Sequence, residues 1–86
     1  MDDLQSLREK VDAIDDQILR DIRERVKICR AIGELKKKQN LAIRDANRES
    51  EVLKRTKEKA ELYKLDPFKI ERLYREIVNI CSAVQE

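Results

Sequence analysis

Hydrophobic residues in the first part of the chain recur with the period of an α-helix. At about 100° per residue, ten positions from Leu4 onward fall on one stripe roughly 80° wide. Eight of them are apolar, and the other two are Arg25 and Lys36. The apolar members are Leu4, Leu7, Val11, Ile14, Ile18, Ile22, Cys29 and Ile32. This pattern predicts one long helix from about Asp3 to Lys38.

Two shorter helices are predicted after it, from about Ala46 to Tyr63 and from about Pro67 to Gln85. Either Asp45 or Asn47 can cap the start of the second helix. Asp66 precedes a proline, which is favoured at the first helical position because its missing N–H leaves no donor unpaired there. The third helix therefore has the clearest start.

Composition agrees with an all-α fold in a single domain over residues 1–86. The chain is 44% charged and 41% hydrophobic, with one Gly and one Pro, whereas strands and turns favour the residue types that are scarce here. A net charge of only +2 makes nucleic-acid binding a minor alternative. The chain has no long apolar run, and its start "MDDLQSLREK" is acidic and polar, so we expect a cytoplasmic protein without membrane spans.

The length of the first helix argues for a partner chain. A helix of about 36 residues is roughly 54 Å long, which exceeds the diameter of a globule of this size. The two shorter helices cannot cover its apolar stripe alone. We therefore predict an antiparallel or intertwined homodimer, in which the long helices of two protomers pack together.

The two cations in the stripe are the first candidates for a functional site. Lys36 lies near a helix end and could extend its ammonium to solvent. Arg25 lies in the middle of the helix, where a buried guanidinium needs a protein carboxylate or an anionic ligand, and both possibilities stay open. The chain has no His, no Gly-rich phosphate loop and no metal-ligand cluster, so no metal or cofactor is expected. Cations, carboxylates and an amide suit the binding of a polyanionic small molecule.

The two cysteines, Cys29 and Cys81, lie far apart in the sequence and form no CxxC pair. Neither a zinc site nor a redox motif is indicated, and both are interpreted as thiols.

Three stretches of the sequence resemble the all-helical chorismate mutases. They are "LREKVDAIDDQILRDIRERVKICRAIGELKK", "IRDANRE" and "LDPFKIERLYREIVNICSAVQ", which together cover nearly the whole chain. The resemblance implies an intertwined homodimer of three-helix chains with two equivalent sites. It also implies an isomerase that converts chorismate to prephenate in phenylalanine and tyrosine biosynthesis, by a pericyclic rearrangement that needs no cofactor.

The same resemblance implies the roles of the residues that bind the substrate carboxylates and the ether oxygen. Arg8 would reach into the site of the partner subunit, and Arg25 would bind a carboxylate within its own chain. Lys36 would contact a carboxylate and the ether oxygen, and Gln85 would donate to that oxygen from the opposite side. At Cys81 the best-known members have a serine, and a thiol is the weaker hydrogen-bond donor.

The "IRDANRE" stretch would supply one wall of the site. There Glu49 would accept from the substrate hydroxyl, and Asp45 and Arg48 would help to order the wall. For Arg44 and Glu51 two interpretations stay open, as members of this wall or as ordinary solvated charges.

Two alternatives remain at this point. Isochorismate-pyruvate lyase shares the fold and also works by a pericyclic route, but its pattern has apolar residues where this chain has Asp45 and Glu49, which favours the mutase. A non-catalytic helical dimer or regulatory domain would be favoured had Arg25, Lys36 or Gln85 been lost.

Overall fold

Three helices make up the protein, and the computed structural model describes residues 3–86. They are α1 (Leu4–Lys38), α2 (Ala46–Leu62) and α3 (Pro67–Gln85). The part of the chain that the structure describes contains no strand, which confirms the predicted all-α class. No helix within it is long and apolar enough to cross a membrane.

Each helix begins at an aspartate that caps it. The carboxylates of Asp3, Asp45 and Asp66 each accept from a backbone N–H two or three residues further on, at 2.7 to 3.2 Å. These bonds satisfy donors that the first helical turn leaves unpaired. Of the two candidates for the start of α2, Asp45 is therefore the cap, and the predicted starts of all three helices agree with the structure to within one residue.

Both α1 and α2 end in the same kind of turn. Asn40 adopts a left-handed conformation with φ of 54°, and the N–H of Leu41 donates to the carbonyl of Lys36 at 2.8 Å. This six-to-one hydrogen bond reverses the chain direction after α1. Lys64 takes the equivalent position after α2 with φ of 59°. For this reason α2 ends one residue before the predicted Tyr63.

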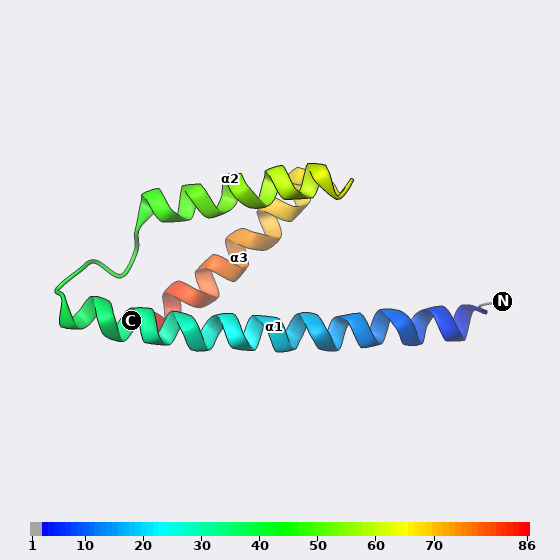
Figure 1. Cartoon of the computed structure of the whole chain (residues 1–86), viewed down its shortest axis with the longest axis horizontal. Coiled ribbons are helices and arrows are strands. Elements are labelled where there is room, and N and C mark those ends of the chain that lie inside the picture. Colours follow the sequence, from blue (N-terminus) through cyan, green and yellow to red (C-terminus); the bar gives the residue numbers. More distant parts are fainter. Residues whose placement is uncertain (1–2) are drawn as a thin grey trace.

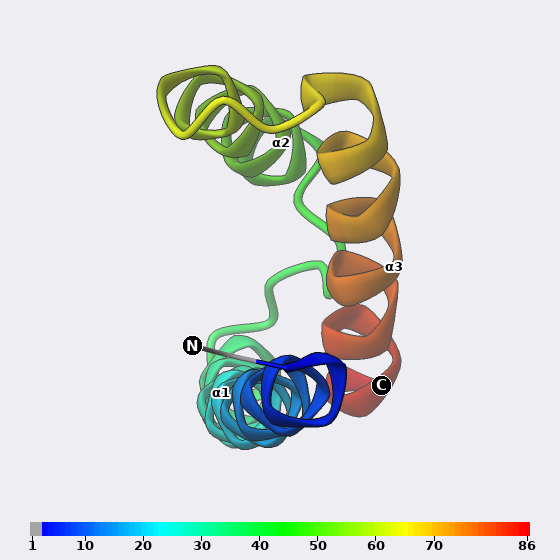
Figure 2. The ribbon, with the colours of Figure 1, turned by 90° about the vertical axis from the view of Figure 1, so that its right-hand side faces the viewer.

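Helix α3 crosses between the other two helices and packs against both of them. In Figure 1, α1 and α2 run side by side at a distance, and α3 spans the gap diagonally. Figure 2, viewed nearly along α1, shows α3 as a wall that joins α1 to α2 and leaves the opposite side open. The molecule is elongated, with extents of 57 × 24 × 15 Å, because α1 projects well beyond its contact with α3.

The contact between α1 and α3 depends on the single glycine of the chain. A Cβ atom added to Gly33 would lie only 2.8 Å from the Cα and 2.9 Å from the Cβ of Gln85. Real Cβ atoms do not approach backbone carbon atoms that closely, so only glycine permits this crossing. The end of α3 is thereby held directly against α1.

Most of the apolar stripe of α1 is uncovered within one chain. Val11 is 56% exposed, Ile14 59% and Ile18 50%, whereas Cys29 and Gly33 at the crossing with α3 are buried. Contiguous apolar surface of this extent on a helix commonly marks an interaction site. The single chain thus provides a small core and one long unpaired apolar face.

Candidate active site

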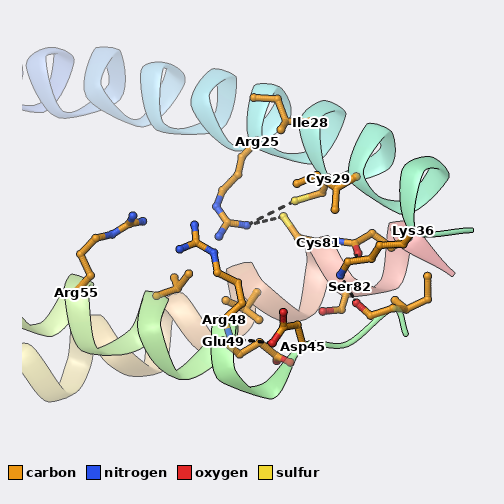
Figure 3. Close-up of a pocket in the computed structure, with 15 residues that line it drawn as sticks. Arg25, Ile28, Cys29, Lys36, Asp45, Arg48, Glu49, Arg55, Cys81 and Ser82 are labelled. Atoms are coloured by element: carbon orange, nitrogen blue, oxygen red, sulfur yellow. Dashed lines mark hydrogen bonds between the residues drawn. The ribbon is translucent and has the colours of Figure 1, made fainter. Parts of the chain in front are cut away.

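A cavity of about 320 Å³ lies between α1 and α2, and residues of α3 close one side of it. Side chains from all three helices line it, and Figure 3 shows them converging from opposite walls. Its charged and amide-bearing lining residues are Arg25, Lys36, Asp45, Arg48, Glu49, Arg55 and Gln85. Four cations against two carboxylates make this a cavity for an anion.

Arg25 projects from the middle of α1 into the cavity. Its Nη1 lies 2.7 Å from the sulfur of Cys81 and 3.9 Å from that of Cys29. Within residues 3–86 no carboxylate forms an ion pair with this guanidinium. Of the two possibilities that the sequence left open, the structural salt bridge is therefore not formed within the chain. A half-buried guanidinium held only by thiols retains donors for an anionic ligand.

Lys36 and Gln85 meet at the end of the cavity where α1 and α3 cross. The ammonium of Lys36 donates to the side-chain oxygen of Gln85 at 3.1 Å and to the backbone carbonyl of Ile43. An ammonium has donors only, so the amide of Gln85 must turn its oxygen toward Lys36 and its NH₂ group away. The third N–H of Lys36 and the NH₂ of Gln85 are then two adjacent donors.

The start of α2 forms a charged wall, in which Arg44 holds Glu49. The guanidinium donates through two nitrogens to the two carboxylate oxygens, at 2.5 and 3.3 Å, and also to the side-chain oxygen of Asn79 at 3.1 Å. The Arg44 hydrogen bond is the main cause that lowers the pKa of Glu49, and Glu49 in turn raises the pKa of Arg44. Glu49 is therefore an ionised acceptor at neutral pH. Arg44 is thus half exposed but also positions Glu49, two possibilities that the sequence left open.

Arg48 follows the capping residue Asp45 on the same wall. Its backbone N–H donates to Asp45 at 3.0 Å, and its guanidinium forms an ion pair with Glu51. Glu51 is accordingly a partner of a cavity residue, although both members of the pair are more than half exposed. Exposed pairs of this kind contribute little to stability, so a ligand could recruit Arg48 at small cost.

Two thiols complete the floor of the cavity. Burial is the main cause that raises the pKa of Cys29 to about 11, followed by its hydrogen bond with Cys81, so Cys29 is protonated at neutral pH. The amide of Gln85 hydrogen-bonds to the sulfur of Cys29, and this bond alone would lower the pKa of Cys29.

Seven of the eight residues singled out in the sequence line this cavity together. They are Arg25, Lys36, Asp45, Arg48, Glu49, Cys81 and Gln85. Arg8 is exposed on the projecting part of α1 and does not line the cavity of its own chain. Sequence reasoning missed Arg55, which lines the cavity from α2. Arg55 follows Arg48 by two helical turns and so lies on the same helix face, a spacing that could have identified it.

The fold is all-helical, and the cation-rich cavity between its helices suits a small anionic ligand in charge. The chain belongs to the chorismate mutase type II family, whose model matches residues 7–86.

Two curated relatives and one solved structure are similar to this chain. A bifunctional chorismate mutase/prephenate dehydratase of Aquifex aeolicus is 35% identical over 89 aligned residues, which cover all of this chain and 25% of that protein. A 3-dehydroquinate dehydratase of Pyrobaculum aerophilum is 33% identical over 95% of this chain and 24% of its own length. The chain thus spans about a quarter of the length of these relatives. Among solved structures, a conserved hypothetical protein from Pyrococcus furiosus superposes with a TM-score of 0.80 at 35% identity, covering 96% of this chain and 95% of that one.

Proposed function

We propose that the protein is a chorismate mutase, an isomerase that rearranges chorismate to prephenate in the biosynthesis of phenylalanine and tyrosine. The observation that carries this proposal is the convergence of three features in one cavity: Arg25, which has no carboxylate partner among residues 3–86, Lys36 beside Gln85, and an ionised Glu49. Chorismate offers two carboxylates, an ether oxygen and a hydroxyl, which match these groups in charge and hydrogen-bonding capacity. Membership of the chorismate mutase type II family supports the same activity.

Substrate binding would begin with the two carboxylates. Arg25 binds one of them from within the chain, with Arg48 and Arg55 adding positive charge from α2. The second is bound by Arg8 of the partner subunit. Glu49, fixed by Arg44, accepts the substrate hydroxyl. Several charge-assisted contacts of this kind hold the extended enolpyruvyl side chain over the ring, which lowers the entropic part of the barrier.

The chemical step would need no nucleophile and no proton transfer. In the pericyclic shift the C–O bond breaks while a C–C bond forms, and negative charge grows on the ether oxygen. Lys36 donates to that oxygen through the N–H that Gln85 and Ile43 do not use, and Gln85 donates through one N–H of its NH₂ group. One well-placed donor to a developing oxyanion is typically worth about 3 to 4 kcal/mol of barrier. The interaction strengthens toward the transition state, so it accelerates the reaction rather than only binding substrate.

The active unit would be an intertwined homodimer. The uncovered stripe of α1 includes Leu4, Leu7 and Val11, each about half exposed or more in the single chain. Packing it against the same stripe of a second copy buries this surface, at roughly 25 cal/mol per Å². The same packing would carry Arg8, which lies on the projecting part of α1, to the cavity of the partner subunit.

A direct assay tests the activity. Purified protein is incubated with chorismate, and the disappearance of chorismate is followed by absorbance. The product is identified by its mass and by its acid conversion to phenylpyruvate. We expect prephenate from the wild type and severe loss of activity in Arg25→Ala. A folded protein that leaves chorismate unchanged, or that instead releases pyruvate from isochorismate, would refute the proposal.

A further inference from the structure

Cys29 of α1 and Cys81 of α3 are distant in the sequence but meet inside the cavity. One nitrogen of Arg25 contacts both sulfurs, at 2.7 Å for Cys81 and 3.9 Å for Cys29. Figure 3 shows the two sulfur atoms turned toward one another at the tip of this guanidinium. The proposed mutase chemistry gives neither thiol a reacting role. The pair is therefore an arrangement of reactive groups that the function leaves unexplained.

The backbone around the two cysteines suits a covalent link between the helices. Gly33 follows Cys29 by four residues, and Gln85 follows Cys81 by four, so each lies one helical turn beyond its cysteine. At Gly33 the helices are so close that a Cβ would lie 2.8 Å from the Cα of Gln85. A disulfide requires Cα atoms within roughly 4.4 to 6.8 Å, which two helices satisfy only near such a close crossing. The glycine therefore brings the cysteine pair together.

Small reagents have access to the thiols, although the residues are only 8% and 4% exposed. Both line the cavity of about 320 Å³, which opens between α1 and α2. A reagent the size of a hydroperoxide can enter a space meant for a larger organic anion.

We propose that Cys29 and Cys81 form an oxidisable dithiol in the floor of the cavity, which a hydroperoxide converts into an intramolecular disulfide. The Cys81 sulfur attacks the peroxide, the O–O bond breaks, and the leaving oxygen takes a proton and departs as water or an alcohol. The resulting sulfenic acid is attacked by the Cys29 sulfur, the S–S bond forms, and the sulfenic oxygen leaves as water with the remaining proton. The two thiols lose two hydrogens and two electrons, and the peroxide is reduced by the same amount.

The order of the two steps follows from the surroundings of each sulfur. The thiolate is the form of a cysteine that attacks a peroxide, and at Cys81 its negative charge would face the guanidinium of Arg25 at 2.7 Å. Cys29 has its pKa raised to about 11 by burial and by its neighbour, which makes it the poorer first nucleophile. A small thiol reverses the bond by two exchange steps.

The disulfide would also change the ligand site, a consequence that rests on the proposed function. An S–S bond of about 2.05 Å draws the sulfurs away from the positions in which both hold the Arg25 guanidinium. Arg25 then loses the contacts that aim it at the substrate carboxylate. Mutase activity should fall at least tenfold on oxidation and return after reduction.

Mass spectrometry of the whole chain decides the covalent part without any activity measurement. Wild-type protein is treated with hydrogen peroxide, denatured, alkylated and weighed. We expect a loss of about 2 Da with no alkylation, and a tryptic cross-link between Ile28–Arg30 and Glu76–Glu86 that dithiothreitol abolishes. Cys29→Ser and Cys81→Ser are matched controls, and each should keep one thiol that is alkylated or takes up oxygen.

Other outcomes overturn the inference. Wild-type protein that gains oxygen in steps of about 16 Da, keeps two alkylatable thiols, or forms only links between chains has no working dithiol. Activity is measured separately on the same samples. A disulfide in a protein that never acts on chorismate would refute the proposed function and leave the dithiol standing, whereas a fully oxidised enzyme with an unchanged rate would refute the inhibitory effect.

Discussion

Replacing Gly33 with alanine should destabilise the protein and slow catalysis at the same time. In an ordinary helix interior this substitution stabilises by up to about 1 kcal/mol. Here the new methyl would lie 2.8 Å from the Cα, 2.9 Å from the Cβ and 3.0 Å from the Cγ of Gln85. Two of these atoms move only with the backbone of α3, so no change of rotamer relieves the contact.

The size of the effect follows from two opposing contributions. Overpacking at a tight contact typically costs about 1 to 3 kcal/mol, and the involvement of backbone places this case at the upper end. Subtracting the gain in helix propensity leaves an expected loss of about 1 to 2 kcal/mol in the free energy of unfolding. To relieve the clash of the new methyl with Gln85, α1 and α3 must separate, and this separation carries Gln85 away from Lys36. A displacement of about 1 Å in a catalytic group can cost up to about 10²-fold in rate, mainly in kcat.

Urea unfolding at one fixed protein concentration, together with steady-state kinetics, tests this reasoning. Glu34→Ala is the matched control, because Glu34 is the exposed neighbour in α1 and its replacement should change stability by less than about 0.5 kcal/mol. Gly33→Ser introduces the same Cβ and should be no better than Gly33→Ala. A Gly33→Ala protein that is more stable than wild type and has an unchanged kcat would show that the α1–α3 crossing is not as close as described.

Three further predictions concern the charged groups of the site. Arg8→Ala and Arg25→Ala should each be nearly inactive. Refolding an equal mixture should restore about a quarter of wild-type activity, because about half of the dimers are then heterodimers and each of these has one intact site of two. Mixtures as inactive as their parents would place both arginines of a site in one chain. Gln85→Glu should gain activity as pH falls from about 8 to 5, because only the protonated glutamic acid can donate to the ether oxygen. A variant whose rate equals that of wild type and does not change with pH would show that Gln85 is not part of the site. The pKa of Glu49 is lowered below its ordinary 4.5, chiefly by Arg44, so this pair contributes stability above pH 4.5 that is lost as pH falls below it. Urea midpoints of Arg44→Ala should therefore depend less on pH below about 4.5 than those of wild type, and the difference should be small because the pair is partly exposed. An unchanged acid dependence would contradict the pairing.

The sequence alone determined the helices of this protein, because the signals that start and stop a helix are local. Asp66 with the following proline and Asp45 at the second joint act within a few residues, so the predicted bounds agree with the structure almost everywhere. The one-residue difference at the end of α2 arises from the left-handed turn at Lys64, a non-glycine residue that sequence patterns seldom place there. Periodicity also placed Arg25 and Lys36 on one face of α1.

Only the tertiary structure decided which side chains meet across helices. The contact of Gly33 with Gln85, the link from Arg44 to Asn79, and the approach of Cys29 to Cys81 join residues that no local spacing relates.

The family resemblance singled out Gln85 and Glu49, but the crossing of α3 over α1 explains how the amide reaches Lys36. The approach of Arg8 to the cavity of a partner subunit requires a second chain and stays a prediction. Local forces shape each helix, whereas the cavity depends on how the three helices pack, including the close contact of α1 and α3 at Gly33.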